Sequence, residues 1–152
     1  MKSFEIELRL LSIDCIRSTE DGDELYVTVE ALYEDKTKDE LKRLPKGEKD
    51  HWQINSGQSL GPNIVLYTGN IGSGVTITVS FREEDAAGIL KIADDVLGGF
   101  TLKVLPDKTI EWKTTKTTHW TGRLDDNAQL MELTGANSLY KVRLILFEKV
   151  PL

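Results

Sequence analysis

Carboxylate side chains gather at three places where the chain is expected to turn between strands. These places are Asp21-Gly22-Asp23-Glu24, Glu83-Glu84-Asp85 and Asp94-Asp95. If the turns meet at one end of a folded domain, their negative charges repel one another strongly unless a cation lies between them. Calcium (Ca²⁺) suits such a place, because it accepts about six to eight oxygen ligands from irregular loops, whereas zinc prefers sulfur or imidazole. The candidate metal ligands are therefore Asp21, Asp23, Glu24, Glu83, Asp85, Asp94 and Asp95.

Nucleophilic and acid–base catalysis have little support in the sequence. The two histidines, His51 and His119, lie in no recognisable catalytic motif. The glycine-rich residues 69–74 match neither the nucleophile elbow nor the dinucleotide-binding fingerprint, so we expect a hairpin turn there. Cys15 lies among isoleucines at the end of the first expected strand, which favours a buried, inert thiol. We therefore predict that the protein is not an enzyme.

Charge and composition exclude several other classes. The 152-residue chain carries 25 acidic and 19 basic residues, for a net charge of −6. Its pI of about 5.0 argues against nucleic-acid binding, which needs a basic face. The single cysteine excludes an internal disulfide and any multi-cysteine zinc site. No segment approaches the roughly 20 apolar residues of a membrane-spanning helix, and residues 1–5 show no apolar signal segment. We expect either a cytoplasmic location or export by a non-classical route.

Hydrophobic alternation predicts the strands that must position these residues. Period-two patterns or short β-prone runs occur at residues 4–11, 25–32, 52–54, 64–67, 75–81, 100–105, 109–118 and 139–147. Turn formers separate these runs, and no long helical period is present. About eight short strands predict one all-β domain over residues 1–152, built as an antiparallel eight-stranded β-sandwich. The polar residues at about 34–50 are expected to form a long surface loop, with one helical turn near residues 39–44.

Residues 23–29, together with residues 79–85 and 94–98, resemble segments of the C2 domains, a family of eight-stranded β-sandwiches that bind calcium and often lipid. Residues 23–29 are similar to the stretch in which an acidic residue ends the family's first calcium loop and a Tyr-Val-x-Val strand follows. Residues 79–85 and 94–98 resemble the second ligand loop, in which an acidic pair precedes a further acidic residue, two apolar residues and glycine. The ligand positions implied by the resemblance are Glu83, Asp85 and Asp95, with Asp23 or Glu24 contributing from the other loop.

The resemblance also implies a C2-like role, in which bound calcium orders a face for a protein partner or a membrane surface. Ile89 and Leu90, in the apolar middle of the second acidic segment, are the candidate membrane-contact residues. We prefer a single helical turn covering the end of the core there, because residues 86, 89, 90 and 93 have helical spacing. Membrane association is therefore an option and not the first choice.

Two functions of other classes stay open beside the calcium-binding module. Trp52, Trp112 and Trp120 are candidates for the aromatic platform of a carbohydrate-binding module, although core packing explains most tryptophans in small sandwiches. The threonine-rich residues 113–120 suit an exposed edge strand that lysines protect from aggregation. A structural or assembly subunit without metal, forming a homo-oligomer, is the other alternative. Our first hypothesis is a non-catalytic calcium-binding β-sandwich module that mediates a protein or membrane interaction.

Overall fold

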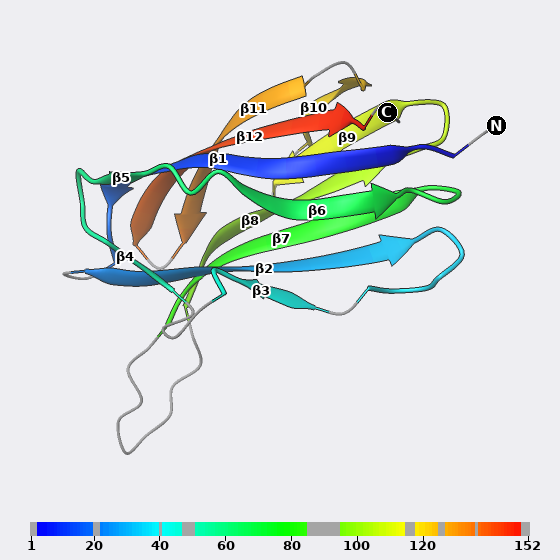
Figure 1. Cartoon of the computed structure of the whole chain (residues 1–152). Helices are drawn as coiled ribbons and strands as arrows, with labels where there is room; N and C mark the ends of the chain where they lie inside the picture. The colour runs from blue at the N-terminus through cyan, green and yellow to red at the C-terminus, as the bar shows by residue number, and fades with distance from the viewer. Residues whose placement is uncertain are drawn as a thin grey trace.

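The fold is an antiparallel β-sandwich. The computed structural model describes residues 3–19, 22–39, 41–46, 51–84, 95–114, 118–124, 127–135 and 137–149. Within these ranges every regular element is a strand, and the strands form two antiparallel sheets packed face to face (Figure 1). The predicted all-β sandwich is confirmed. In the same ranges no helix is long and apolar enough to cross a membrane.

The first sheet has five strands in the order β11-β12-β1, with β5 and β6 both pairing with the far side of β1. These strands are β1 (Glu5–Arg17), β5 (Ser59–Leu60), β6 (Ile64–Asn70), β11 (Asn127–Gly135) and β12 (Ser138–Glu148). The first two predicted strands, which correspond to β1 and β2, lie in different sheets, so the acidic turn between them crosses the sandwich.

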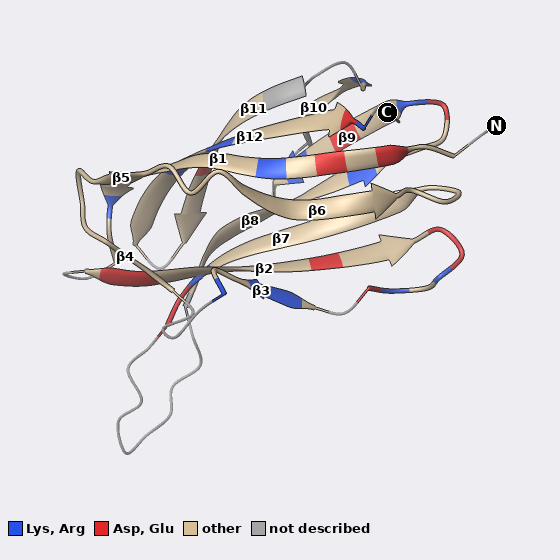
Figure 2. Ribbon diagram, in the orientation of Figure 1, with Lys and Arg blue, Asp and Glu red and all other residues tan. Residues whose placement is uncertain are grey.

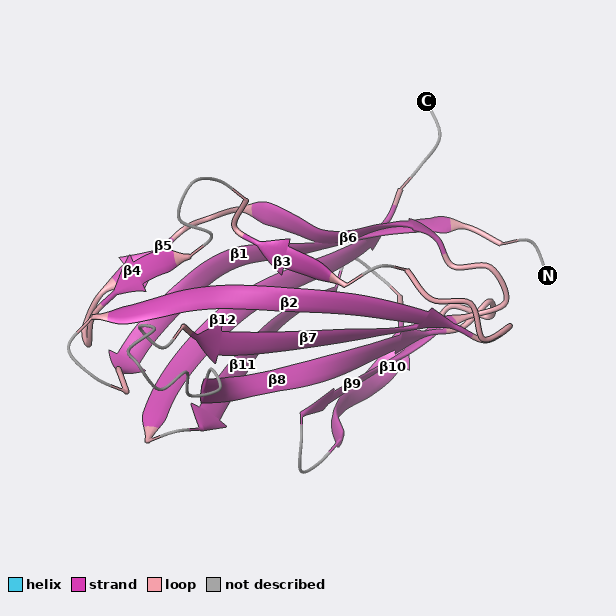
Figure 3. Cartoon of the chain, turned by 90° about the horizontal axis from the view of Figure 1, so that it is seen from below, coloured by secondary structure: helices cyan, strands magenta, loops and turns pink. Residues whose placement is uncertain are grey.

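The second sheet has seven strands in the order β10-β9-β8-β7-β2, with β3 and β4 both pairing with the far side of β2. Figure 3 shows its long strands side by side. The strands are β2 (Asp23–Tyr33), β3 (Lys42–Leu44), β4 (Trp52–Ile54), β7 (Val75–Glu83), β8 (Asp95–Val104), β9 (Thr109–Thr114) and β10 (Thr118–Arg123).

The described chain thus has twelve strand segments rather than the eight that the sequence predicts. The single run at residues 109–118 divides into β9 and part of β10, which form a hairpin with β10 at the edge of the sheet. The predicted helical turn near residues 39–44 is wrong, because residues 42–44 form β3 instead. β3 therefore interrupts the predicted long polar loop. It pairs with the edge of β2 and so supplies hydrogen-bond partners for backbone N–H and C=O groups of β2 that would otherwise need water.

The core lies between the sheets and follows the predicted alternation. In β7, Val75, Ile77, Val79 and Phe81 are buried, while the threonines and serine between them are more exposed. Trp112 is fully buried, and its ring lies 5.7 Å from that of Phe100, centre to centre. One continuous apolar cluster therefore joins both sheets.

The two sheets approach each other closely where β8 faces β11. Gly98 has a positive φ of 141°, and a Cβ placed there would lie only 2.8 Å from the Cβ of Leu133 on β11. A Cβ on Gly135 would lie 2.5 Å from the carbonyl oxygen of Val96. These glycines let the backbones of the two layers meet at this corner of the sandwich.

Candidate functional site

The start of β2, the end of β7 and the start of β8 meet at one end of the second sheet. Leu25 faces Glu83 across the β2–β7 pair, and Glu83 faces Asp95 across the β7–β8 pair. The backbone N–H of Glu84 donates to the carbonyl oxygen of Glu24 at 2.8 Å. Acidic residues from separate segments therefore lie together at this end of the sandwich (Figure 2). We call the end formed by residues 23–25, 83–84 and 95 the acidic pole.

Asp23 points into the interior of the sandwich and is fully buried. Its Oδ2 accepts hydrogen bonds from the backbone N–H of Thr19, at 2.9 Å, and from the hydroxyl of Tyr140 on β12. Burial raises the pKa of Tyr140 above its ordinary value, and the hydrogen bond to Asp23 raises it further. Asp23 therefore joins the second sheet to the first through a buried hydrogen bond.

Glu83 of the acidic pole and Cys15 of the facing sheet are also buried. Glu83 is the last inward-facing residue of β7 and is fully buried. Cys15 on β1 is 1% exposed, so its predicted burial is confirmed. Burial raises the pKa of the Cys15 thiol, while a hydrogen bond with Tyr140 acts in the opposite direction. A thiol held in its neutral form in this way is a poor nucleophile.

A mixed cluster of carboxylates and imidazole lies at the outer side of the acidic pole. Glu24, His51 and Glu84 each bring one potential ligand atom within 4.8 Å of the other two, and all three are half-buried. Nδ1 of His51 lies 3.0 Å from Oε2 of Glu84, and Nη2 of Arg43 lies 3.3 Å from the same oxygen. The Arg43 guanidinium also stacks over the Tyr26 ring, 3.7 Å from its centre. We call residues 24, 51 and 84 the Glu24–His51–Glu84 cluster.

Backbone pairing explains why these three residues meet. Glu24 is opposite Gln53 in the β2–β4 pair, which holds His51, the residue just before β4, close to the start of β2. Glu84 follows directly after β7, the other neighbour of β2. The sequence did not suggest His51 as a metal ligand, because β4 is only three residues long and its pairing with β2 leaves no periodic signal.

The other predicted site residues of the acidic segments are only partly described. Asp95 begins β8, but its side chain lies outside the described part of the structure, as do Asp21, Asp85 and Asp94. Ile89 and Leu90, the candidate membrane-contact residues, also lie outside it. Their predicted roles stay predictions.

The three tryptophans do not form a common aromatic platform. Trp112 is fully buried in the core, so its ring is not available to a sugar. Trp52 on β4 and Trp120 on β10 are partly buried against the core and belong to opposite edges of the second sheet. The three-residue carbohydrate platform is therefore wrong, because the inward alternation of β9 directs Trp112 between the sheets.

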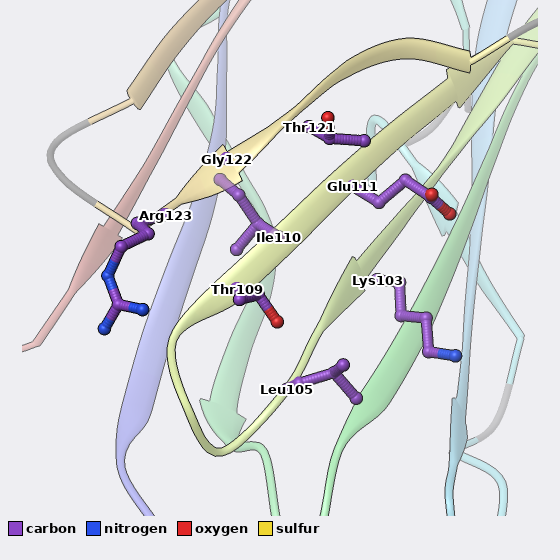
Figure 4. Close-up of a pocket in the computed structure, with 8 residues that line it drawn as sticks. All are labelled: Lys103, Leu105, Thr109, Ile110, Glu111, Thr121, Gly122 and Arg123. Atoms are coloured by element: carbon purple, nitrogen blue, oxygen red, sulfur yellow. The ribbon is translucent and has the colours of Figure 1, made fainter.

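A cavity of about 480 Å³ opens on the second sheet over β8, β9 and β10 (Figure 4). Its lining residues are Lys103, Leu105, Thr109, Ile110, Glu111, Thr121, Gly122 and Arg123. This lining includes neither a tryptophan nor a residue of the acidic pole. The cavity therefore supports neither the carbohydrate platform nor the predicted calcium site.

Comparison with solved structures gives a likeness of fold. No protein-family model matches the chain, and no curated protein matches it. Among solved structures, a C2 domain of plant extended synaptotagmin 1, the one designated A, is similar, with a TM-score of 0.46 and 13% identity over 98% of this chain and 96% of that one. The chain is thus similar to a C2 domain, and its class, an antiparallel β-sandwich, is defined by its own strand pairing.

Proposed function

We propose that the protein is a non-catalytic, C2-like binding module whose acidic pole binds calcium and so prepares a face for a protein partner or a membrane. The register Leu25–Glu83–Asp95 carries this proposal, because it puts the acidic segments on adjacent strands of one sheet. Adjacent strands are about 4.8 Å apart, so carboxylates at these strand ends repel one another and favour a bound cation.

The described residues supply part of the proposed calcium site. Glu24 and Glu84 offer carboxylate oxygens at the pole, while Asp23 already accepts hydrogen bonds from Thr19 and Tyr140. Because calcium takes about six to eight oxygens, the proposal assigns the remaining ligands to the loop carboxylates. These are Asp21, Asp85, Asp94 and Asp95.

A binding role has more support than catalysis. The only cysteine of the chain is buried with a raised thiol pKa. The imidazole of His51 lies against the Glu84 carboxylate, which is already in contact with Arg43. These arrangements suit a structural or ligand-binding cluster better than an activated nucleophile.

Thermal melts in EDTA, calcium and magnesium test the proposal. A ligand that binds only the folded state stabilises it by about 2.7 kcal/mol when its concentration is one hundred times its Kd. Calcium at millimolar concentration should therefore raise Tm, and Asp85→Asn or Asp95→Asn should remove most of the shift. Glu132→Gln is the matched control, since this exposed carboxylate lies on β11 in the other sheet and pairs with Lys141. An unchanged wild-type Tm in calcium would end the calcium proposal.

Co-sedimentation with vesicles tests the membrane part of the proposal separately. Vesicles that contain phosphatidylserine should retain the protein in calcium and release it in EDTA, and Ile89→Ser with Leu90→Ser should weaken retention. Calcium-induced stabilisation without vesicle binding would favour a protein partner. Self-association in EDTA, measured by light scattering, would favour the assembly-subunit alternative instead.

A further inference from the structure

We propose that Glu24, His51 and Glu84 bind a transition-metal cation of the zinc type, through one imidazole nitrogen and two carboxylates. This inference deepens the cation-binding role of the acidic pole, and it rests on the proposed function in sharing Glu24 and Glu84 with the calcium ligands. It differs in the metal, because His51 introduces a nitrogen ligand that calcium does not favour.

The three side chains come from segments that backbone hydrogen bonds hold in place. Glu84 donates its N–H to the carbonyl oxygen of Glu24, and the β2–β4 register fixes the backbone next to His51. The potential ligand atoms already lie within 4.8 Å of one another. Zinc ligands at about 2.0–2.2 Å from the metal are roughly 3.3 Å apart in a tetrahedron, so small side-chain rotations complete the arrangement.

His51 adds an imidazole nitrogen to the two carboxylates of the cluster. Its side chain is 14% exposed, and its Nδ1 is buried without a hydrogen bond among the described residues, although Oε2 of Glu84 lies 3.0 Å away. A neutral nitrogen lone pair that faces a carboxylate oxygen is repulsive, and either a proton or a metal ion on the nitrogen relieves the repulsion. The Glu24 carboxylate close by adds a second negative charge and a second oxygen ligand.

Arg43 does not bind the metal in the proposed site but orients the carboxylate of Glu84. It contacts Oε2 of Glu84 while its guanidinium is stacked on Tyr26. A fixed partner of this kind orients a ligating carboxylate, as outer-shell groups commonly do in metal sites. Its positive charge also opposes that of the metal, so we expect weaker binding than in a four-ligand structural zinc site.

Metal titration of the chelator-treated full chain tests the inference. Zinc should bind with one equivalent per chain by calorimetry, and cobalt(II) should give d–d absorption that zinc abolishes. His51→Gln and Glu84→Gln should each weaken zinc binding at least about tenfold. His119→Gln, which removes the only other histidine, and Glu132→Gln should leave the affinity unchanged.

A second measurement uses the wild-type protein alone, in case His51→Gln folds poorly. Bound zinc should protect His51, but not His119, from modification by diethyl pyrocarbonate, as read by peptide mass spectrometry. Equal modification of His51 with and without zinc would overturn the inference, and so would zinc binding that His51→Gln leaves intact. A calcium-induced Tm shift that persists in His51→Gln would retain the calcium proposal even if zinc does not bind, so the two can fail separately.

Discussion

Asp23 is a predicted metal ligand, but in the structure its carboxylate accepts hydrogen bonds inside the fold. It is fully buried and is bonded to the backbone N–H of Thr19 and the hydroxyl of Tyr140. Burying a carboxylate is costly unless hydrogen bonds compensate for the lost water. Tyr140 and the nearby Cys15 complete a small buried polar group that spans the two sheets.

Tyr140→Phe should destabilise the protein, because it removes a hydroxyl donor to the buried Asp23 carboxylate. We expect the free energy of unfolding, measured in urea, to fall by about 1–3 kcal/mol. Tyr33→Phe is the control, since the Tyr33 hydroxyl is only partly buried where it meets Tyr67 and Asp39. A loss for Tyr140→Phe no larger than that for Tyr33→Phe would count against this role.

Alkaline pH should destabilise the fold. The pKa values of Tyr140 and Tyr67 are both raised above 10.0, with burial as the largest cause in each. The unfolded chain releases these protons near pH 10 while the folded chain retains them, so stability is full below pH 10 and falls above it. The fall should approach about 1.4 kcal/mol per pH unit for each tyrosine. Urea unfolding of the wild type and of Tyr67→Phe at a series of pH values above 10 measures this fall in the free energy of unfolding. If the free energy falls equally steeply with pH in both proteins, the assignment to Tyr67 is contradicted.

At the level of the elements, most of the long strands could be predicted, whereas of the three shortest only β4 (residues 52–54) was predicted, and its pairing with β2 was not. The alternation of Val75, Ile77, Val79 and Phe81 identifies β7 because each strand with one buried face carries its own pattern. The strands β3, β4 and β5 have only two or three residues, and they exist because a neighbouring strand edge needs hydrogen-bond partners.

The dependence of short strands on their neighbours also limits how much of the site could be predicted. The acidic segments could be found from the sequence, and their adjacency followed from the pairing of long strands. His51 could not be found, because its place beside Glu24 depends on a three-residue strand. β11 was also missed, since its apolar residues occur on both faces: Met131 is buried, while Leu130 is 52% exposed.

Gly98→Ala should disturb the contact between β8 and β11. The new Cβ would lie 2.8 Å from the Cβ of Leu133, and the φ of 141° disfavours any side chain. We expect a loss of more than about 1 kcal/mol in the free energy of unfolding. Gly57→Ala is the control for backbone strain, because Gly57 has a φ of 84° and no atom within 4 Å of the new Cβ. Equal losses in the two variants would show that the close approach is unimportant.

At the level of the whole molecule, one apolar cluster joins the sheets, so the sandwich should unfold as a unit. Cys15 lies within this cluster and is 1% exposed. Its labelling by a thiol reagent should therefore require global opening and should slow as the protein is stabilised. In urea, one thiol per chain should react at once. Rapid labelling in native buffer would mean that the end of β1 opens by itself.

The ends of the described chain lie far from the acidic pole. Ile6 pairs with Glu148, so β1 begins beside the end of β12, whereas the pole lies beyond the other end of β1. At about 3.3 Å per residue, the thirteen residues of β1 separate these ends by roughly 40 Å. A neighbouring domain, a fluorophore or a sensor chip attached near Glu5 or Glu148 would leave the pole unobstructed. The domain can therefore be tethered at one end while the acidic pole stays accessible at the other.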